Sequence, residues 1–214
     1  MKLNKKLLAT GVLAASMFAG QAWGAVSAEE AAKLGNSLTP MGAEKAGNGG
    51  AIPPWTGGLT TPPPGYNNDG IYVNPFADEQ PKFTIDQNNV EQYKDNLSPG
   101  QVAMIERYDD YFMPVYETHR TAAYPEEVME QTVENATTVE LIKDGNGLGN
   151  YQSATPFPIP QNGLEAIWNH ITRYRGGSVQ RTVGQVTPTE GGEFSVVKFQ
   201  DELTWRTYLS DYNP

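Results

Sequence analysis

The most regular hydrophobic pattern of the chain lies in residues 164–171, where apolar side chains recur at positions i, i+3, i+4 and i+7. This spacing places them on one face of an amphipathic helix. The residues of this stripe are Leu164, Ile167, Trp168 and Ile171. We expect the stripe to face the core, with Asn169, His170 and Arg173 on the opposite, polar edge.

The pattern changes after Gly176-Gly177 to the alternation of apolar and polar side chains that is typical of strands. It predicts strands over residues 178–187 and 193–200, joined by a turn at residues 190–192. A last strand is expected over residues 203–209. Because helices come first and antiparallel strands follow, the chain is expected to have an α+β fold.

Shorter elements are expected earlier in the chain. Ser98, Pro99 and Gln101 mark a helix start, because serine caps a helix, proline suits its first turn and glutamine reaches back to the cap. The aromatic segment 111–116 is expected to be an edge strand, since Pro114 cannot donate a ladder hydrogen bond. The remaining expected elements are helices over residues 27–38, 83–97 and 125–135, a strand over 138–142 and a turn over 144–147.

Residues 39–65 show no periodicity and are rich in proline and glycine, so they can form neither a helix nor a central strand. This extended arm is either a flexible linker or a strap across the domain. The large aromatic side chain of Trp55 favours the strap and is our candidate for a contact with a partner protein. We expect a helix and arm over residues 25–82 and an α+β domain over residues 83–214.

Residues 1–24 have the layout of a cleavable signal peptide, with three lysines followed by an apolar run over residues 7–19. The run is too short to span a bilayer, which takes roughly 20 apolar residues. Cleavage is expected before Ala25 or, as a second choice, after residues 26–28. An uncleaved amphipathic N-terminus is the alternative. We therefore expect a periplasmic protein that does not span the membrane.

Composition narrows the range of partners. Removal of the signal peptide leaves 12 basic and 25 acidic side chains and a formal charge of −13. Such a charge repels phosphate backbones, so nucleic acid is not an expected partner. The chain has no cysteine, which excludes thiol catalysis, disulfides and thiolate metal sites.

The sequence offers little catalytic chemistry. Its two histidines, His119 and His170, lie neither in an H-E-x-x-H motif nor in a cluster with zinc spacing. A G-x-S-x-G nucleophile motif is absent. Asp109 and Asp110 are adjacent carboxylates of the kind that acid–base catalysis uses, but acidic helix ends are more often solvated surface. We predict no catalytic residue, no metal site and no cofactor; a hydrolase that uses Asp109, Asp110 or His119 is the weakest hypothesis.

Residues 116–120 combine aromatic, charged and polar side chains. If they form a strand, Tyr116, Thr118 and Arg120 face one side, and Glu117 and His119 face the other. Facing inward, this segment would make polar contacts inside a groove. Facing outward, it would be ordinary surface.

Four stretches together resemble an uncharacterised family of Gram-negative periplasmic proteins whose fold is similar to that of the lipoprotein carriers LolA and LolB. They read LTPMGAEKAGN at 38–48, IPPWTGG at 52–58, MPVY followed by THRTAA at 113–123, and PFPIP, NGLEAIWNH and RYRG within 156–176. The resemblance covers essentially all of the mature chain. It implies that this chain is the N-terminal part of a longer domain.

The resemblance further implies a curved antiparallel sheet, an open half-barrel, with helices on its concave face. In the carriers this cavity holds acyl chains, and members of the family are often associated with export pumps and outer-membrane proteins. The candidate ligand-binding residues are Tyr116, Thr118, His119, Arg120, Trp168, Ile171 and Tyr174.

Two hypotheses lead. The first is a non-enzymatic periplasmic protein that carries or presents a lipid or another lipophilic molecule, which calls for an apolar cavity between helices and sheet. The second is a structural or adaptor protein that docks onto an envelope export assembly through its proline-rich arm.

Overall fold

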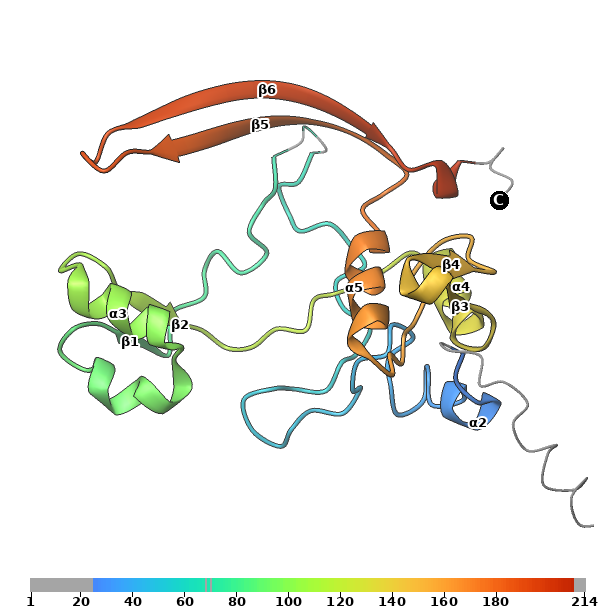
Figure 1. Cartoon of the computed structure of the whole chain (residues 1–214). Coiled ribbons are helices and arrows are strands. Elements are labelled where there is room, and N and C mark those ends of the chain that lie inside the picture. The colour runs from blue at the N-terminus through green and yellow to red at the C-terminus, as the bar shows by residue number, and fades with distance from the viewer. Residues whose placement is uncertain (1–24, 68, 70, 210–214) are drawn as a thin grey trace, which may run out of the picture. The chain divides into compact units, whose positions relative to one another are not determined.

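The computed structural model describes residues 25–67, 69 and 71–209 (Figure 1). The expected signal peptide lies outside the described residues. The chain divides into two compact units: a central unit, residues 45–123, and a terminal unit, which combines residues up to 44 with residues from 124 onward. This division differs from the expected one, which places its boundary at residue 82.

The central unit contains one small sheet packed against two helices. Its elements are β1 (Phe83–Ile85), the 3₁₀-helix η1 (Val90–Asn96), α3 (Pro99–Arg107) and β2 (Met113–Val115). The strands are antiparallel, with Phe83 opposite Val115. The buried core residues are Ile85, Val90 and Ile105, and the partly buried residues packed on them are Tyr93, Leu97, Val102, Tyr111, Met113 and Val115.

The predicted capping box opens α3. The Ser98 hydroxyl accepts from the Gln101 backbone N–H at 3.3 Å, and the Gln101 side chain accepts from the Ser98 N–H at 2.8 Å. The expected edge strand is also confirmed, because Pro114 lies in β2 of a two-stranded sheet.

The helix expected over residues 83–97 is wrong in its first half. Phe83–Ile85 is a strand, because its aromatic and β-branched side chains pair with β2. The chain then turns at Asp86, whose N–H donates to the Asn89 side chain at 2.9 Å. Only Val90–Asn96 is helical, as a 3₁₀-helix.

The terminal unit contains the remaining elements. They are α2 (Ala28–Ala31), α4 (Glu126–Thr138), β3 (Glu140–Ile142), η2 (Lys143–Gly145), β4 (Gly147–Gly149), α5 (Gly163–Thr172), β5 (Ser178–Pro188), β6 (Phe194–Thr204) and η3 (Arg206–Tyr208). The antiparallel pairs are β3 with β4 and β5 with β6, and Figure 1 shows the second pair as a long, curved hairpin. Helices and short antiparallel sheets, without a closed barrel among the described strands, form an α+β arrangement.

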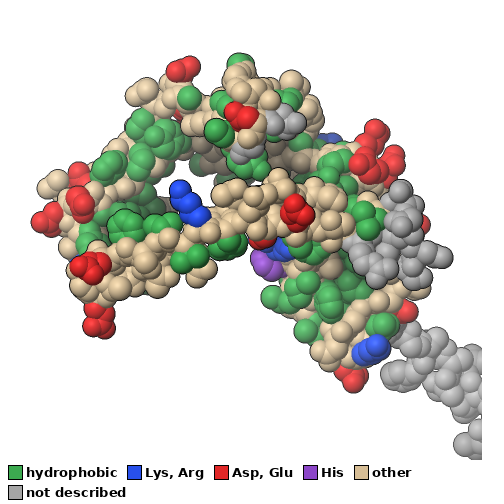
Figure 2. Space-filling view, turned by 90° about the horizontal axis from the view of Figure 1, so that it is seen from above, with side chains coloured by type: hydrophobic (Ala, Val, Ile, Leu, Met, Phe, Trp, Pro, Cys, Tyr) green, Lys and Arg blue, Asp and Glu red, His purple; other side chains and the backbone are tan. Residues whose placement is uncertain are grey.

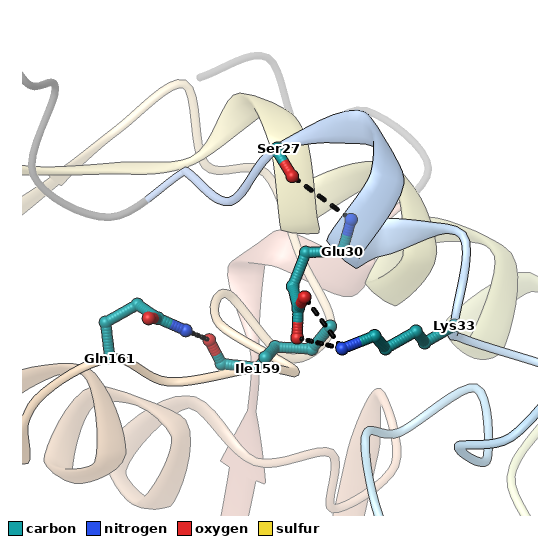
Figure 3. A network of polar contacts seen from close by, with 5 residues as sticks. All are labelled: Ser27, Glu30, Lys33, Ile159 and Gln161. Carbon is teal, nitrogen blue, oxygen red and sulfur yellow. Dashed lines mark hydrogen bonds and ion pairs between the residues drawn. The ribbon is translucent and has the colours of Figure 1, made fainter.

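The first helix of the terminal unit is much shorter than expected. Ser27 caps it as predicted, accepting from the Glu30 N–H at 3.1 Å, and Glu30 pairs with Lys33 (Figure 3). However, α2 ends at Ala31, and a turn follows in which Gly35 has a φ of 79°. That left-handed conformation suits glycine and ends a helix, so the helix expected over residues 27–38 is wrong beyond Ala31.

The later boundaries also differ. The expected helix over residues 125–135 is confirmed but continues to Thr138, so the following strand starts at residue 140. The expected separate strand over residues 203–209 is wrong. β6 continues without a break to Thr204, since its pairing with β5 extends over eleven residues, and η3 follows it.

We expect Gly42→Ala to destabilise the terminal unit by about 2 kcal/mol, which combines left-handed strain with a backbone clash. Gly42 has a φ of 89°, and a Cβ there would lie 1.7 Å from the Pro158 carbonyl oxygen. Urea unfolding followed by circular dichroism measures the change. Gly35→Ala is the matched control, because Gly35 has a similar φ of 79° and no atom within 4 Å of an added Cβ. Equal losses for the two variants would contradict a clash at Gly42.

Candidate functional site

The seven candidate ligand-binding residues fall into both units. Tyr116, Thr118, His119 and Arg120 belong to the central unit, and Trp168, Ile171 and Tyr174 belong to the terminal unit. The candidate residues therefore do not form one site within a single unit.

In the central unit, the segment after β2 is irregular. Residues 116–120 do not form a strand, because β2 ends at Val115 and its partner β1 begins opposite it at Phe83. Tyr116 is 46% exposed. The side chains of residues 116–120 therefore do not alternate between two faces of a strand. Tyr116 and His119, which a strand would place on opposite faces, line the same cavity.

The proline-rich arm lies along this irregular segment as a strap. The Trp55 indole N–H donates to the Ala122 carbonyl at 2.9 Å, and the Leu59 N–H donates to the Thr121 carbonyl at 2.9 Å. Arg120 donates to the Lys45 carbonyl at 3.2 Å. The structure thus favours the strap over the linker. That Trp55 contacts a partner stays a prediction, and its N–H is engaged within the unit.

His119 meets a turn of the chain that lies 40 residues before it. Its Nε2 is 2.9 Å from Glu79 Oε2, and its ring stacks on Phe76 with 3.8 Å between centroids and 7° between planes. The turn is built locally: the Asn74 side chain accepts from the Phe76 N–H at 2.9 Å, and the Glu79 N–H donates to the Phe76 carbonyl at 3.0 Å. This geometry presents Phe76 and Glu79 together to His119.

A cavity of about 540 Å³ opens beside this turn, and a second of about 280 Å³ adjoins the same residues and Tyr116. The apolar lining residues of the larger cavity are Pro63, Pro64, Val73, Pro75, Phe76 and Ala77, and its polar ones are Asn74, Asp78, Glu79 and His119. The sequence pointed to His119 and Tyr116 but not to Phe76 or Glu79. Asn74-Pro75 is a turn signal, but no signal links it to residue 119.

In the terminal unit, α5 has the opposite orientation to the expected one. Leu164, Ile167 and Ile171 of the apolar stripe are 49%, 57% and 47% exposed, whereas the polar residue Glu165 is fully buried. The expected burial of the stripe is therefore wrong for these three residues. Trp168 is half-buried, and its indole N–H donates to the Gly145 carbonyl at 2.9 Å.

Polar side chains of α5 explain this orientation. Asn169 exchanges two hydrogen bonds with the Phe157 backbone, at 2.9 Å and 2.7 Å. Glu165 accepts from the Gln161 N–H at 2.5 Å. The segment Pro156–Pro160 is rich in proline and cannot pair its own backbone in a helix or a sheet. The helix therefore turns its hydrogen-bonding edge inward and leaves its aliphatic stripe outside.

The β5–β6 hairpin is amphipathic toward its root, whereas near its turn Val186, Phe194 and Val196 are exposed on the opposite face. Paired residues share a face in an antiparallel ladder, so the pairing places five apolar side chains on one face, the apolar hairpin face: Val179, Val183, Val197, Phe199 and Leu203. The other face of its root is polar, with Ser178, Gln180, Thr182, Gln200, Glu202 and Thr204. Phe199 and Val197 are 40% and 58% exposed.

One ion pair crosses the apolar hairpin face. Arg181 donates to both carboxylate oxygens of Asp201 at 2.7 Å each, and these hydrogen bonds lower the pKa of Asp201. This bidentate contact joins two residues that lie directly opposite each other in the ladder.

The root of the hairpin is anchored to the rest of the unit. The Ala154 N–H donates to the Tyr208 hydroxyl at 3.0 Å, burial raises the pKa of Tyr208, and Tyr174 contacts its ring edge-on at 5.2 Å. Tyr174 therefore packs against η3, the segment that follows the hairpin. Apolar side chains, drawn in green, lie open at the surface in several places in Figure 2.

The acidic residues that entered the hydrolase hypothesis have ordinary surface contacts. Asp109 accepts from the Gln87 side chain at 3.0 Å, and Asp110 is exposed at the surface. Within the described ranges, no group of three or more histidine or carboxylate side chains is arranged to hold a metal ion. None of the described helices has the length and apolar character needed to cross a membrane.

The chain matches the model of a family described as a protein of unknown function, DUF1329, over residues 84–214. It is 60% identical over 216 residues to an uncharacterized protein of Pseudomonas aeruginosa, an alignment that covers all of this chain and 48% of that protein. The chain thus spans about half the length of the curated relative that it matches. No solved structure matches it. The expectation of an uncharacterised family is confirmed, and the chain belongs to the DUF1329 family of proteins of unknown function.

Proposed function

We propose that this protein is a non-enzymatic binding protein of the periplasm that carries or presents a lipid or another lipophilic molecule. The observation that supports the proposal most is the exposed aliphatic stripe of α5, formed by Leu164, Ile167 and Ile171. It belongs to the same unit as the apolar hairpin face. The layout of residues 1–24 supports export, with cleavage before Ala25.

The energetics of such binding are simple. Each methylene group that an acyl chain buries contributes about 0.8 kcal/mol. A contiguous apolar surface therefore binds a lipid without a nucleophile or a metal. Isolated exposed apolar side chains are ordinary, but grouped ones mark interaction surfaces. The stripe repeats over two turns of α5, and all three of its aliphatic residues are more than 45% exposed.

The architecture agrees with a carrier. A curved antiparallel sheet with a helix on its concave face is the arrangement that the resemblance to LolA and LolB implies. The β5–β6 hairpin is a curved antiparallel sheet segment (Figure 1), and α5 is a helix of the same unit with an exposed aliphatic stripe. We propose that they are part of an open half-barrel whose apolar side receives the ligand.

A second candidate function is an adaptor that docks onto an envelope export pump or an outer-membrane protein. The observation that favours it lies in the arm, where Ile71 and Tyr72 are 69% and 92% exposed. Among the described residues before Phe83, these two are the most exposed large apolar side chains.

We expect the double variant Ile167→Gln/Ile171→Gln to weaken the binding of a fluorescent fatty acid at least ~10-fold, since it removes two aliphatic side chains from the stripe. Fluorescence titration of the purified chain measures the affinity. Both positions are exposed, so the thermal midpoint should change little.

The matched control is Ile71→Gln/Tyr72→Gln, which also removes two exposed apolar side chains. It should leave the fatty acid affinity unchanged. If the stripe variant binds as tightly as the parent chain, or if the parent chain does not bind, the carrier proposal is wrong. A partner captured by the parent chain and lost only in the arm variant supports the adaptor instead.

A further inference from the structure

We infer that the cavity beside His119 in the central unit binds a small molecule that carries a primary ammonium group on a compact apolar body. This site is separate from the surfaces of α5 and the hairpin, and it goes beyond the proposed lipid binding. The inference rests on the shape of the cavity, the orientation of His119 and the hydrogen-bonding character of the polar lining.

The cavity has the size and composition of a small-molecule site. Its volume of about 540 Å³ lies within the range of roughly 300 to 1,000 Å³ typical of such sites. Rigid proline rings and the Phe76 ring form apolar walls. Polar side chains are few, as they are in sites that orient a ligand by a small number of hydrogen bonds.

The contact with Glu79 determines which nitrogen of His119 carries the proton. A carboxylate only accepts hydrogen bonds, and Nε2 lies 2.9 Å from Glu79 Oε2, so Nε2 is the protonated nitrogen. In the neutral imidazole, Nδ1 is then an acceptor. The stacked ring of Phe76 fixes the plane of the imidazole. His119 is 37% exposed at its side chain, so a ligand can reach it.

The polar lining is therefore rich in acceptors. Asp78 and Glu79 contribute carboxylates, and His119 in its neutral form contributes Nδ1 as an acceptor. The described residues that line either cavity include no lysine or arginine. A matching ligand has to donate hydrogen bonds and carry positive charge.

A primary ammonium meets these needs, because it offers three donors and a full charge. Tyr116, which lines the adjoining smaller cavity, adds an aromatic ring of the kind that attracts cations. The proline and phenylalanine walls accept the apolar body of the molecule.

The test is isothermal titration of the mature chain at pH 7.5 with three probes that share one apolar body: benzylamine, benzyltrimethylammonium and benzyl alcohol. We expect benzylamine to bind at least ~10-fold more tightly than either of the others, since only benzylamine combines charge with N–H donors. Ethanolamine, which has the ammonium without the apolar body, should bind at least ~10-fold more weakly than benzylamine.

Glu79→Gln keeps the size of the side chain and removes its charge, and it should weaken benzylamine binding ~10-fold. Glu117→Gln is the matched control, because Glu117 pairs with Lys82 at 2.8 Å and does not line the cavity. It should leave the affinity unchanged. The α5 stripe variant should also bind benzylamine normally, which separates this site from the lipid-binding proposal.

Three results would overturn the inference. The first is equal affinity for benzylamine and benzyl alcohol, or no binding of benzylamine. The second is an equal loss in Glu79→Gln and Glu117→Gln, which would indicate a general effect of negative charge. The third is ethanolamine binding as tight as that of benzylamine, which would leave no role for the apolar walls.

Discussion

Replacing Asn135 with aspartate is expected to lower the free energy of unfolding by about 4 kcal/mol at pH 7. The substitution buries a negative charge and leaves two backbone carbonyl groups without their hydrogen-bond donor. Asn135 is 1% exposed on α4. Its amide nitrogen donates to the Ser153 carbonyl at 2.8 Å and the Thr155 carbonyl at 3.0 Å. Aspartate has the same size, but its carboxylate has no N–H and would face both carbonyl oxygens.

Urea unfolding followed by circular dichroism measures this loss. A buried carboxylate has a raised pKa, so its charged form is the destabilising one, and the deficit relative to the parent chain should shrink as the pH falls. The matched control is Asn146→Asp, because Asn146 is exposed and donates only to the Lys143 carbonyl, at 3.2 Å. It should change the stability by less than about 0.5 kcal/mol. A similar loss of unfolding free energy in both variants would mean that Asn135 does not hold the segment of Ser153 and Thr155.

The second large effect is expected at Glu165, which is fully buried at the start of α5. Its two carboxylate oxygens accept from the Gln161 N–H at 2.5 Å and from the Asn162 amide at 2.7 Å, while Asn162 caps the helix by accepting from the Glu165 N–H at 3.1 Å. Glu165→Ala leaves both donors without these acceptors and opens a cavity. We expect a loss of about 3 kcal/mol in the free energy of unfolding.

The same unfolding measurement tests Glu165. Glu165→Gln keeps one carbonyl acceptor and the volume of the side chain, so its loss should be smaller than that of alanine. Glu130→Ala is the control, because Glu130 is exposed on α4 and should change the stability by less than about 0.5 kcal/mol. If Glu165→Ala is as stable as the parent chain, the buried cap does not hold α5 in its orientation.

The parts of the fold that were predictable from the sequence are those that local patterns determine. Ser98, Pro99 and Gln101 specify the start of α3 through contacts within four residues. Alternation and a glycine turn specify the β5–β6 hairpin. The segment Phe83–Ile85 was misassigned, because its strand pairs with residues about 30 positions away and local helical spacing does not register that pairing.

The orientation of α5 was not predictable from hydrophobicity. A stripe of aliphatic residues ordinarily faces the core, but here Glu165 and Asn169 bond a proline-rich segment that needs backbone partners. The hydrogen bonds of two polar side chains therefore decide which face is buried. Nothing in the spacing of the stripe reveals them.

The candidate site was also only partly predictable from the sequence. The unusual combination of residue types in residues 116–120 indicates a candidate site, and Tyr116 and His119 both line the smaller cavity of the central unit. Their neighbours Phe76 and Glu79 come from a turn 40 residues away, so only the folded chain brings them to His119.

The most direct test of the carrier proposal is native mass spectrometry of the mature chain purified from the periplasm, with extraction and identification of any bound lipid. We expect a lipophilic molecule in stoichiometric amount, which is lost in the double variant Ile167→Gln/Ile171→Gln. A mass equal to that of the bare chain, unchanged after incubation with envelope lipids, would contradict it.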